Sequence, residues 1–228
     1  MRLRLTSITA FTICSLSMRA ESQRPSALNP AIRQHTIDAA ALGVNPGAFA
    51  QYGLTDNLGW SAITGLPFGG GVLRAGYTDG FETRVVSLGY ARTIAKWDFG
   101  AFGTLASGLD MVGAYNTAYA SAVADRAVRA AIPLSLRWGS PSALSLAPYI
   151  APFAEAGVRA TYGTAAADCA FCFSPRVGLN STRSIGSITG LDFTVWHLRF
   201  DFAGRNVWGH RLDRSQYSAG IRWNFSSR

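Results

Sequence analysis

Charged residues are scarce in this sequence, and lysine is almost absent. Charged side chains make up 15% of the 228 residues, whereas ordinary soluble domains use about 25%. Lys96 is the single lysine, so the formal net charge of +8 comes almost wholly from arginines. These arginines are scattered singly along the chain, which argues against the clustered basic surface that binds nucleic acid. We therefore expect no nucleic-acid partner.

Long hydrophobic runs are also missing, although 48% of the residues are hydrophobic. Gly, Arg, Asp and Ser interrupt every apolar stretch before it reaches the roughly 20 residues that a transmembrane helix requires. In hydrocarbon every backbone N–H and C=O has to be paired within the protein. A chain that spans a bilayer without helices must therefore close into a β-barrel. The length suits one such domain, and nothing in the composition demands a second.

The N-terminus has the pattern of an export signal. A positively charged start (MRLR) precedes a mostly apolar run over 5–18, and cleavage is expected between about Ser17 and Ala20. We therefore assign 1–20 to a signal peptide, with a disordered or mis-assigned start as the alternative. The Ser-, Pro-, Arg- and Asn-rich segment 21–34 is expected to be a flexible lead-in, and 35–228 the barrel.

The few cysteines restrict the metal and redox chemistry. Cys14 lies in the expected signal, which leaves Cys169 and Cys172 as a close pair in a predicted loop. In an oxidising compartment this pair predicts a small loop disulfide. A metal site would need two further ligands, and neither a second cysteine pair nor a nearby histidine cluster is present. We predict neither a metal nor a cofactor.

Beyond the lead-in, apolar and polar residues alternate in successive segments, which predicts strands with two chemically different faces. In the last segment Tyr217, Ile221 and Trp223 share one face, and Arg222 and Asn224 share the other. About ten strands are expected, with eight or twelve as alternatives. The predicted ranges are 36–44, 48–54, 58–66, 83–92, 97–107, 126–138, 144–160, 184–194, 197–205 and 215–225. The fold class is all-β, a transmembrane up-and-down antiparallel β-barrel.

The predicted connections alternate in length. Short turns are expected at 55–57, 93–96, 139–143 and 195–196. Longer loops are expected at 67–82, 108–125, 161–183 and 206–214. Outer-membrane barrels have short turns on the periplasmic rim and longer loops on the outer rim. The short turn at 45–47 interrupts this alternation.

Tryptophan positions separate a membrane barrel from a soluble one. Five of the six tryptophans lie beside a predicted short turn or near the C-terminal end: Trp60, Trp97, Trp138, Trp196 and Trp223. Indoles concentrate where hydrocarbon meets headgroups, so these five are predicted to form the periplasmic aromatic girdle. A soluble lipocalin-like barrel or sandwich also explains the alternation, but it leaves the tryptophans unexplained.

The segment 217–225, with aromatic residues at alternate positions and Phe225 near the end, resembles the C-terminal strand of Gram-negative outer-membrane β-barrel proteins. The segment 52–58 is similar to a hairpin of small porin-like or transporter-like barrels. The resemblance implies location in the outer membrane, contact with its lipid and lipopolysaccharide, and recognition of the last strand by the barrel-assembly machinery. Ser226-Ser227-Arg228 after the phenylalanine departs from the family pattern.

By strand parity, seven basic and four acidic side chains point into the barrel, an excess of +3. They are Lys96, Asp98, Arg129, Arg137, Glu155, Arg159, Asp192, Arg199, Asp201, Arg205 and Arg222. Opposite charges that face each other across a narrow lumen can pair and fill it, which predicts an interior ionic network. A narrow, weakly anion-selective pore is the alternative.

No catalytic constellation stands out, and we predict that the protein is not an enzyme. His210 lies near Asp213 and Ser215, but neighbours in sequence rarely form a hydrolytic triad. Three functions remain: a structural or interaction barrel, a small weakly anion-selective pore or transporter, and a lipid-modifying enzyme with polar groups clustered at a rim. Arginines such as Arg176 and Arg183 could contact acidic lipopolysaccharide or be ordinary solvated charges.

Overall fold

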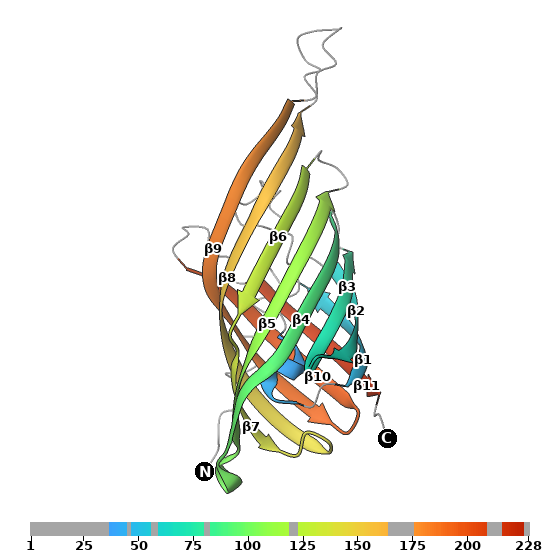
Figure 1. Cartoon of the computed structure of the whole chain (residues 1–228). Coiled ribbons are helices and arrows are strands. Elements are labelled where there is room, and N and C mark those ends of the chain that lie inside the picture. The colour runs from blue at the N-terminus through green and yellow to red at the C-terminus, as the bar shows by residue number, and fades with distance from the viewer. Residues whose placement is uncertain are drawn as a thin grey trace, which may run out of the picture.

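The computed structural model describes residues 37–44, 47–55, 59–79, 83–118, 123–163, 176–208 and 216–225. Within these ranges the chain forms strands and two short 3-10 helices (Figure 1). The helices are η1 (Ala39–Leu42) and η2 (Gly100–Phe102). The strands are β1 (Ala48–Thr55), β2 (Gly59–Phe68), β3 (Gly71–Asp79), β4 (Thr83–Asp98), β5 (Thr104–Ala118), β6 (Val123–Ala131), β7 (Leu134–Gly139), β8 (Leu144–Gly163), β9 (Arg176–Val195), β10 (Leu198–Val207) and β11 (Gln216–Phe225).

The strands close into a ten-strand antiparallel barrel. Apart from β6 and β7, strands that are consecutive in sequence pair with each other, and β1 pairs with β11 to complete the circle. β6 and β7 are two parts of one barrel strand, because both pair with β5 on one side and with β8 on the other. The interruption falls at Ile132 and Pro133, where proline has no N–H to donate. The predicted fold class and strand number are confirmed.

Several predicted elements are wrong, and among them the predicted loop 108–125 lies largely within β5 and the start of β6. The range 36–44 is not a wall strand, because its described residues form η1, with Asp38 capping the N-terminus and Gly43 ending it at φ +78°. The triplet 39–41 is all alanine and carries no two-residue alternation. The predicted loop 67–82 instead contains β3, in which Arg74 and Thr78 point inward. The glycines in that stretch made it look like a loop.

One rim of the barrel carries the short connections 69–70, 99–103, 140–143 and 196–197, together with the start of β1 and the end of β11. This is the lower end in Figure 1. The opposite rim is joined by 56–58, 80–82, 119–122, 164–175 and 208–215. The predicted turn 55–57 therefore belongs to this second rim. The predicted turn 93–96 is part of β4, where a bulge between Thr93 and Ala95 shifts the register.

The side chains of the wall are polar inside and apolar outside. In β10, Arg199, Asp201 and Arg205 are buried, whereas Phe202 is 55% exposed. In β11, Arg222 is buried and the flanking Ile221 and Trp223 are exposed. Among the described residues no helix is long and apolar enough to cross a membrane.

Candidate functional site

The segment Ile37–Val44 folds into the lumen and forms a plug. Every side chain from Ile37 to Leu42 is buried. Asp38 accepts a hydrogen bond from the Ala40 N–H at 2.9 Å, which caps the single helical turn. Its own N–H donates to Asp110 on β5 at 2.9 Å. The Thr93 hydroxyl donates to the Ala40 carbonyl and the Ser135 hydroxyl to the Leu42 carbonyl, so three wall strands hold the plug backbone.

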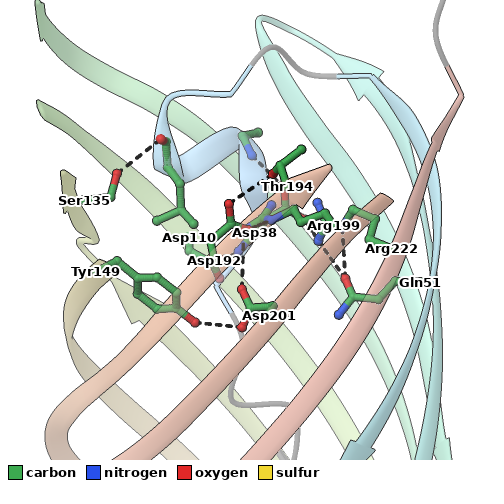
Figure 2. Close-up of polar contacts among 12 residues, drawn as sticks. Asp38, Gln51, Asp110, Ser135, Tyr149, Asp192, Thr194, Arg199, Asp201 and Arg222 are labelled. Carbon is green, nitrogen blue, oxygen red and sulfur yellow. Dashed lines mark hydrogen bonds and ion pairs between the residues drawn. The ribbon is translucent and has the colours of Figure 1, made fainter. Parts of the chain in front are cut away.

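A charged cluster ties the plug to the wall. Asp38 forms ion pairs with Arg74 on β3 and Arg222 on β11, both at 3.4 Å. Arg74 also pairs with Asp110 at 2.5 Å, and Arg222 donates to the Gln51 side chain at 2.8 and 3.0 Å. Figure 2 shows Asp38 close to Arg222, which reaches the Gln51 side chain. Because one carboxylate joins strands from opposite ends of the sequence, the plug completes the ionic network of the barrel.

A second cluster spans β7 to β10 around Asp192. Arg199 contacts Asp192 and pairs with Asp201 at 3.4 Å. Arg137 pairs with Asp192 at 3.4 Å, and the Tyr149 hydroxyl donates to Asp201 at 3.0 Å. All five side chains are buried, so each charge depends on its partner rather than on water.

A third cluster, formed by Arg205, Glu155 and Gln216, lies on β10, β8 and β11. Arg205 donates to Glu155 at 2.8 Å and to Gln216 at 2.9 Å. The guanidinium also lies over the Phe153 ring, 5.0 Å from its centroid.

Inward aromatic rings lie against glycines on the next strand. Phe49 is paired with Gly65, where an added Cβ would lie 2.1 Å from the ring. The same arrangement holds for Phe153 with Gly186 and for Tyr149 with Gly190. Because these glycines have no side chain, the rings can pack against the wall. The centre of the lumen is then occupied by the arginine side chains and the plug.

Eight of the eleven charges predicted to face the lumen are buried in these clusters or beside them. They are Arg129, Arg137, Glu155, Asp192, Arg199, Asp201, Arg205 and Arg222. Lys96 and Asp98 are exposed at the rim with the short turns, where Asp98 accepts a hydrogen bond from the Gly100 N–H, so they are not part of a buried network. The side chain of Arg159 lies outside the described residues.

Sequence reasoning missed Asp38, Arg74 and Asp110, which link the plug to the wall. The interior charge changes accordingly. Among the described residues six arginines and five carboxylates are buried, and six minus five gives +1 rather than the predicted +3. The corrected interior is nearly neutral because the plug and β5 supply two further carboxylates.

The tryptophans divide between two rims. Trp97, Trp138, Trp196 and Trp223 lie at the rim with the short turns, and all four are exposed. Trp60 lies at the opposite rim, next to Leu54 and Asp79, so its predicted place in the first girdle is wrong. The reason is that 56–58 is an outer connection.

The second rim has an aromatic band of its own. The Trp60 ring lies 6.4 Å from Tyr52 and 5.6 Å from Tyr77, and Trp208 is exposed at the end of β10. Between Trp196 and Trp208 lie the ten residues of β10. At about 3.3 Å per residue and a tilt of about 40°, they span roughly 25 Å, the height of the apolar band of outer-membrane barrels.

Aromatic bands at both ends, exposed apolar side chains between them and a charged interior occur together in one class of protein. The chain has the architecture of an outer-membrane β-barrel. Its short-turn rim corresponds to the periplasmic end, because periplasmic turns are short and outer loops are longer.

Comparison with known proteins gives likenesses in structure only. No protein-family model and no curated protein sequence matches the chain. The outer membrane enzyme PagL is 16% identical, with 78% of this chain and 99% of PagL covered and a TM-score of 0.38. The KdgM porin is 10% identical, with 79% and 99% covered and a TM-score of 0.37. The N-terminal β-barrel domain of Pseudomonas aeruginosa OprF is 10% identical, with 80% and 100% covered and a TM-score of 0.33. These values bear on neither activity nor ligand.

Several predicted features lie outside the described residues. These are the signal peptide 1–20, the lead-in 21–34, the pair Cys169 and Cys172, and His210 with Asp213 and Ser215. Among the described residues no group of three or more His, Cys, Asp or Glu side chains is arranged to hold a metal ion. The disulfide and the expectation that the protein is not an enzyme stay predictions.

Proposed function

We propose that this protein is a closed, non-conducting β-barrel of the Gram-negative outer membrane, with a structural or interaction role carried by its outer surfaces. The observation that supports this proposal most is the plug. Its side chains are buried and its backbone is held by Asp110, Thr93 and Ser135, so the segment occupies the lumen at the level of the charged clusters.

The ionic interior supports a closed state over the alternative of a small anion-selective pore. A permeating anion needs arginine charge that is free to exchange partners. Here each buried cluster pairs arginines with carboxylates of nearby strands, and the buried excess is +1. An ion entering this lumen would have to break these pairs, each of which is costly to leave unmatched.

The test is conductance in planar bilayers containing the full chain. The wild type is expected to show no stable conductance steps. Gly108→Ala is expected to open the lumen, because an added Cβ on β5 would lie 2.1 Å from the Ala41 carbonyl oxygen and would push the plug from its seat.

The matched control is Gly113→Ala on the same strand. A Cβ there has Val128 as its nearest neighbour, at 3.8 Å, and clashes with nothing. The control variant, like the wild type, should show no stable conductance steps. Stable conductance steps in the wild-type protein would refute the proposal.

A further inference from the structure

A groove of about 810 Å³ runs along the outer wall across β3, β4, β5, β6, β8 and β9. Met111, Ala130, Ala154 and Ile185 are directly paired across four strands and therefore share one face. Met111 is 47% and Ile185 57% exposed, so this face is the outside of the barrel. The groove thus opens toward the surrounding lipid rather than into the lumen.

Small and large apolar residues alternate along the groove. Gly113, Ala130, Ala154 and Ala156 are small lining residues. Val128 projects between Gly113 and Ala156, and Leu88 and Trp208 also line the groove. A Cβ at Gly113 would meet no atom closer than 3.8 Å, so packing within the wall does not require a glycine there. The volume lies in the range of pockets that hold small organic ligands.

Two outward arginines lie on the part of this face nearer the outer rim. Arg183 on β9 lines the groove, is paired with Ala156 and is exposed. Among the described residues no carboxylate lies within ion-pair distance of it. Arg126 on β6 is exposed, and its guanidinium lies 5.6 Å from the centroid of the Tyr115 ring.

An unpaired arginine on a lipid-facing wall is costly unless an anion or water meets it. The cost is greatest at the bilayer midplane and falls toward the interface. Arg183 lies two residues beyond Ile185, whose carbonyl accepts from the N–H of the rim residue Trp208. The guanidinium is therefore at headgroup level, where its planar donors suit a phosphate.

We propose that this groove binds the lipid A part of a lipopolysaccharide molecule, with acyl chains along its apolar floor and phosphates on Arg183 and Arg126. The groove lies toward the rim opposite the short turns, which faces the outer leaflet. Lipid A combines several acyl chains with phosphates on one headgroup, which matches a broad apolar groove with more than one arginine at its upper end. The inference goes beyond the proposed function, because an open barrel could carry the same site.

The experiment is native mass spectrometry of the full chain, released from detergent micelles, with three added lipids. These are diphosphorylated lipid A, the same lipid A without phosphates, and phosphatidylglycerol. One lipid A is expected to bind each barrel. Loss of the phosphates, or Arg183→Ala, should weaken binding by about tenfold or more, because either change removes charge-assisted hydrogen bonds between guanidinium and phosphate. Arg92→Ala, which removes another exposed outward arginine on β4, should leave binding unchanged.

The groove itself is tested by filling it. Ala154→Trp should abolish retention of lipid A, whereas Ala62→Trp, at an exposed position on β2 outside the groove, should not. Each variant is first shown to be folded by its heat-dependent migration in SDS gels. Equal binding of phosphatidylglycerol or dephosphorylated lipid A would overturn the proposal. So would equal effects of Arg183→Ala and Arg92→Ala, or of the two tryptophan variants.

Discussion

At the residue scale, the interior contains buried arginines and carboxylates that interact with one another instead of with water. Arg205 and Glu155 are both nearly fully buried and 2.8 Å apart. Such a pair adds little net stability compared with apolar side chains of similar volume. Removing one partner, however, leaves a buried charge without compensation. Within each cluster, each charged side chain therefore depends on its partner to remain buried.

Arg205→Met should lower the free energy of unfolding by about 3–5 kcal/mol, because Glu155 would lose the guanidinium that is hydrogen-bonded to it in a buried site. The urea midpoint of the barrel in lipid vesicles, followed by tryptophan fluorescence, measures this change. Arg92→Met at an exposed outward site is the control and should shift the midpoint little.

The double variant Arg205→Met with Glu155→Met should recover part of the loss, since it removes both charges and supplies apolar volume. If the single and double variants are equally destabilised, the loss comes from packing and the ionic account of this cluster is wrong.

The side chains that point into the lumen could be predicted wherever the two-residue alternation of a strand was unbroken. Arg199, Asp201 and Arg205 follow from the alternation of one segment, and all three are buried. Asp38 and Asp110 were missed because one lies in a segment predicted as a strand and the other in a predicted loop. The signal for Asp110 was present in the outward series Leu105, Leu109, Met111 and Tyr115, which alternates with small and polar residues over 104–118.

At the element scale, the accuracy of prediction depended on turns. β10 and β11 were located within one or two residues because a tight turn and a long connection bound them. β4 was cut short because the bulge at Thr93 breaks the two-residue period, so no parity rule carries across it. The plug could not be distinguished from a wall strand, because three consecutive alanines suit either environment.

The last strand serves both closure and, we propose, recognition by the barrel-assembly machinery. Phe225 pairs with Ala48 at the closing seam and is 53% exposed on the outer face. Phe225→Ala should reduce the folded, heat-modifiable fraction in isolated outer membranes several-fold, because the terminal aromatic residue would no longer be recognised. Refolding of purified protein into vesicles should be nearly unaffected.

Phe202→Ala is the matched control, since Phe202 is 55% exposed on the neighbouring β10. Its folded fraction in cells should remain near that of the wild type. Equal losses for both variants, or an equal defect in vesicles, would mean that lost apolar contact rather than recognition limits assembly.

At the scale of the whole molecule, one arrangement connects the wall, the plug and the rims. Apolar side chains cover the outside between two aromatic bands, and the inside holds paired charges and a buried helical turn. Alternation together with the tryptophan positions predicted this sidedness, and in a membrane barrel the reverse would move every arginine of β10 and β11 into hydrocarbon. The plug required coordinates, since its contacts join segments far apart in the chain.

Nitroxide accessibility along β10 tests this sidedness most directly. Single spin labels at 200–205 are introduced into protein in lipid vesicles after the native cysteines are replaced by serine. Labels at Phe200, Phe202 and Gly204 should show high collision rates with oxygen and low rates with a water-soluble nickel complex, because they face acyl chains. Labels at Asp201, Ala203 and Arg205 should show low rates with both, because the interior is packed. High nickel accessibility at Phe202, or the same values at neighbouring positions, would contradict the account.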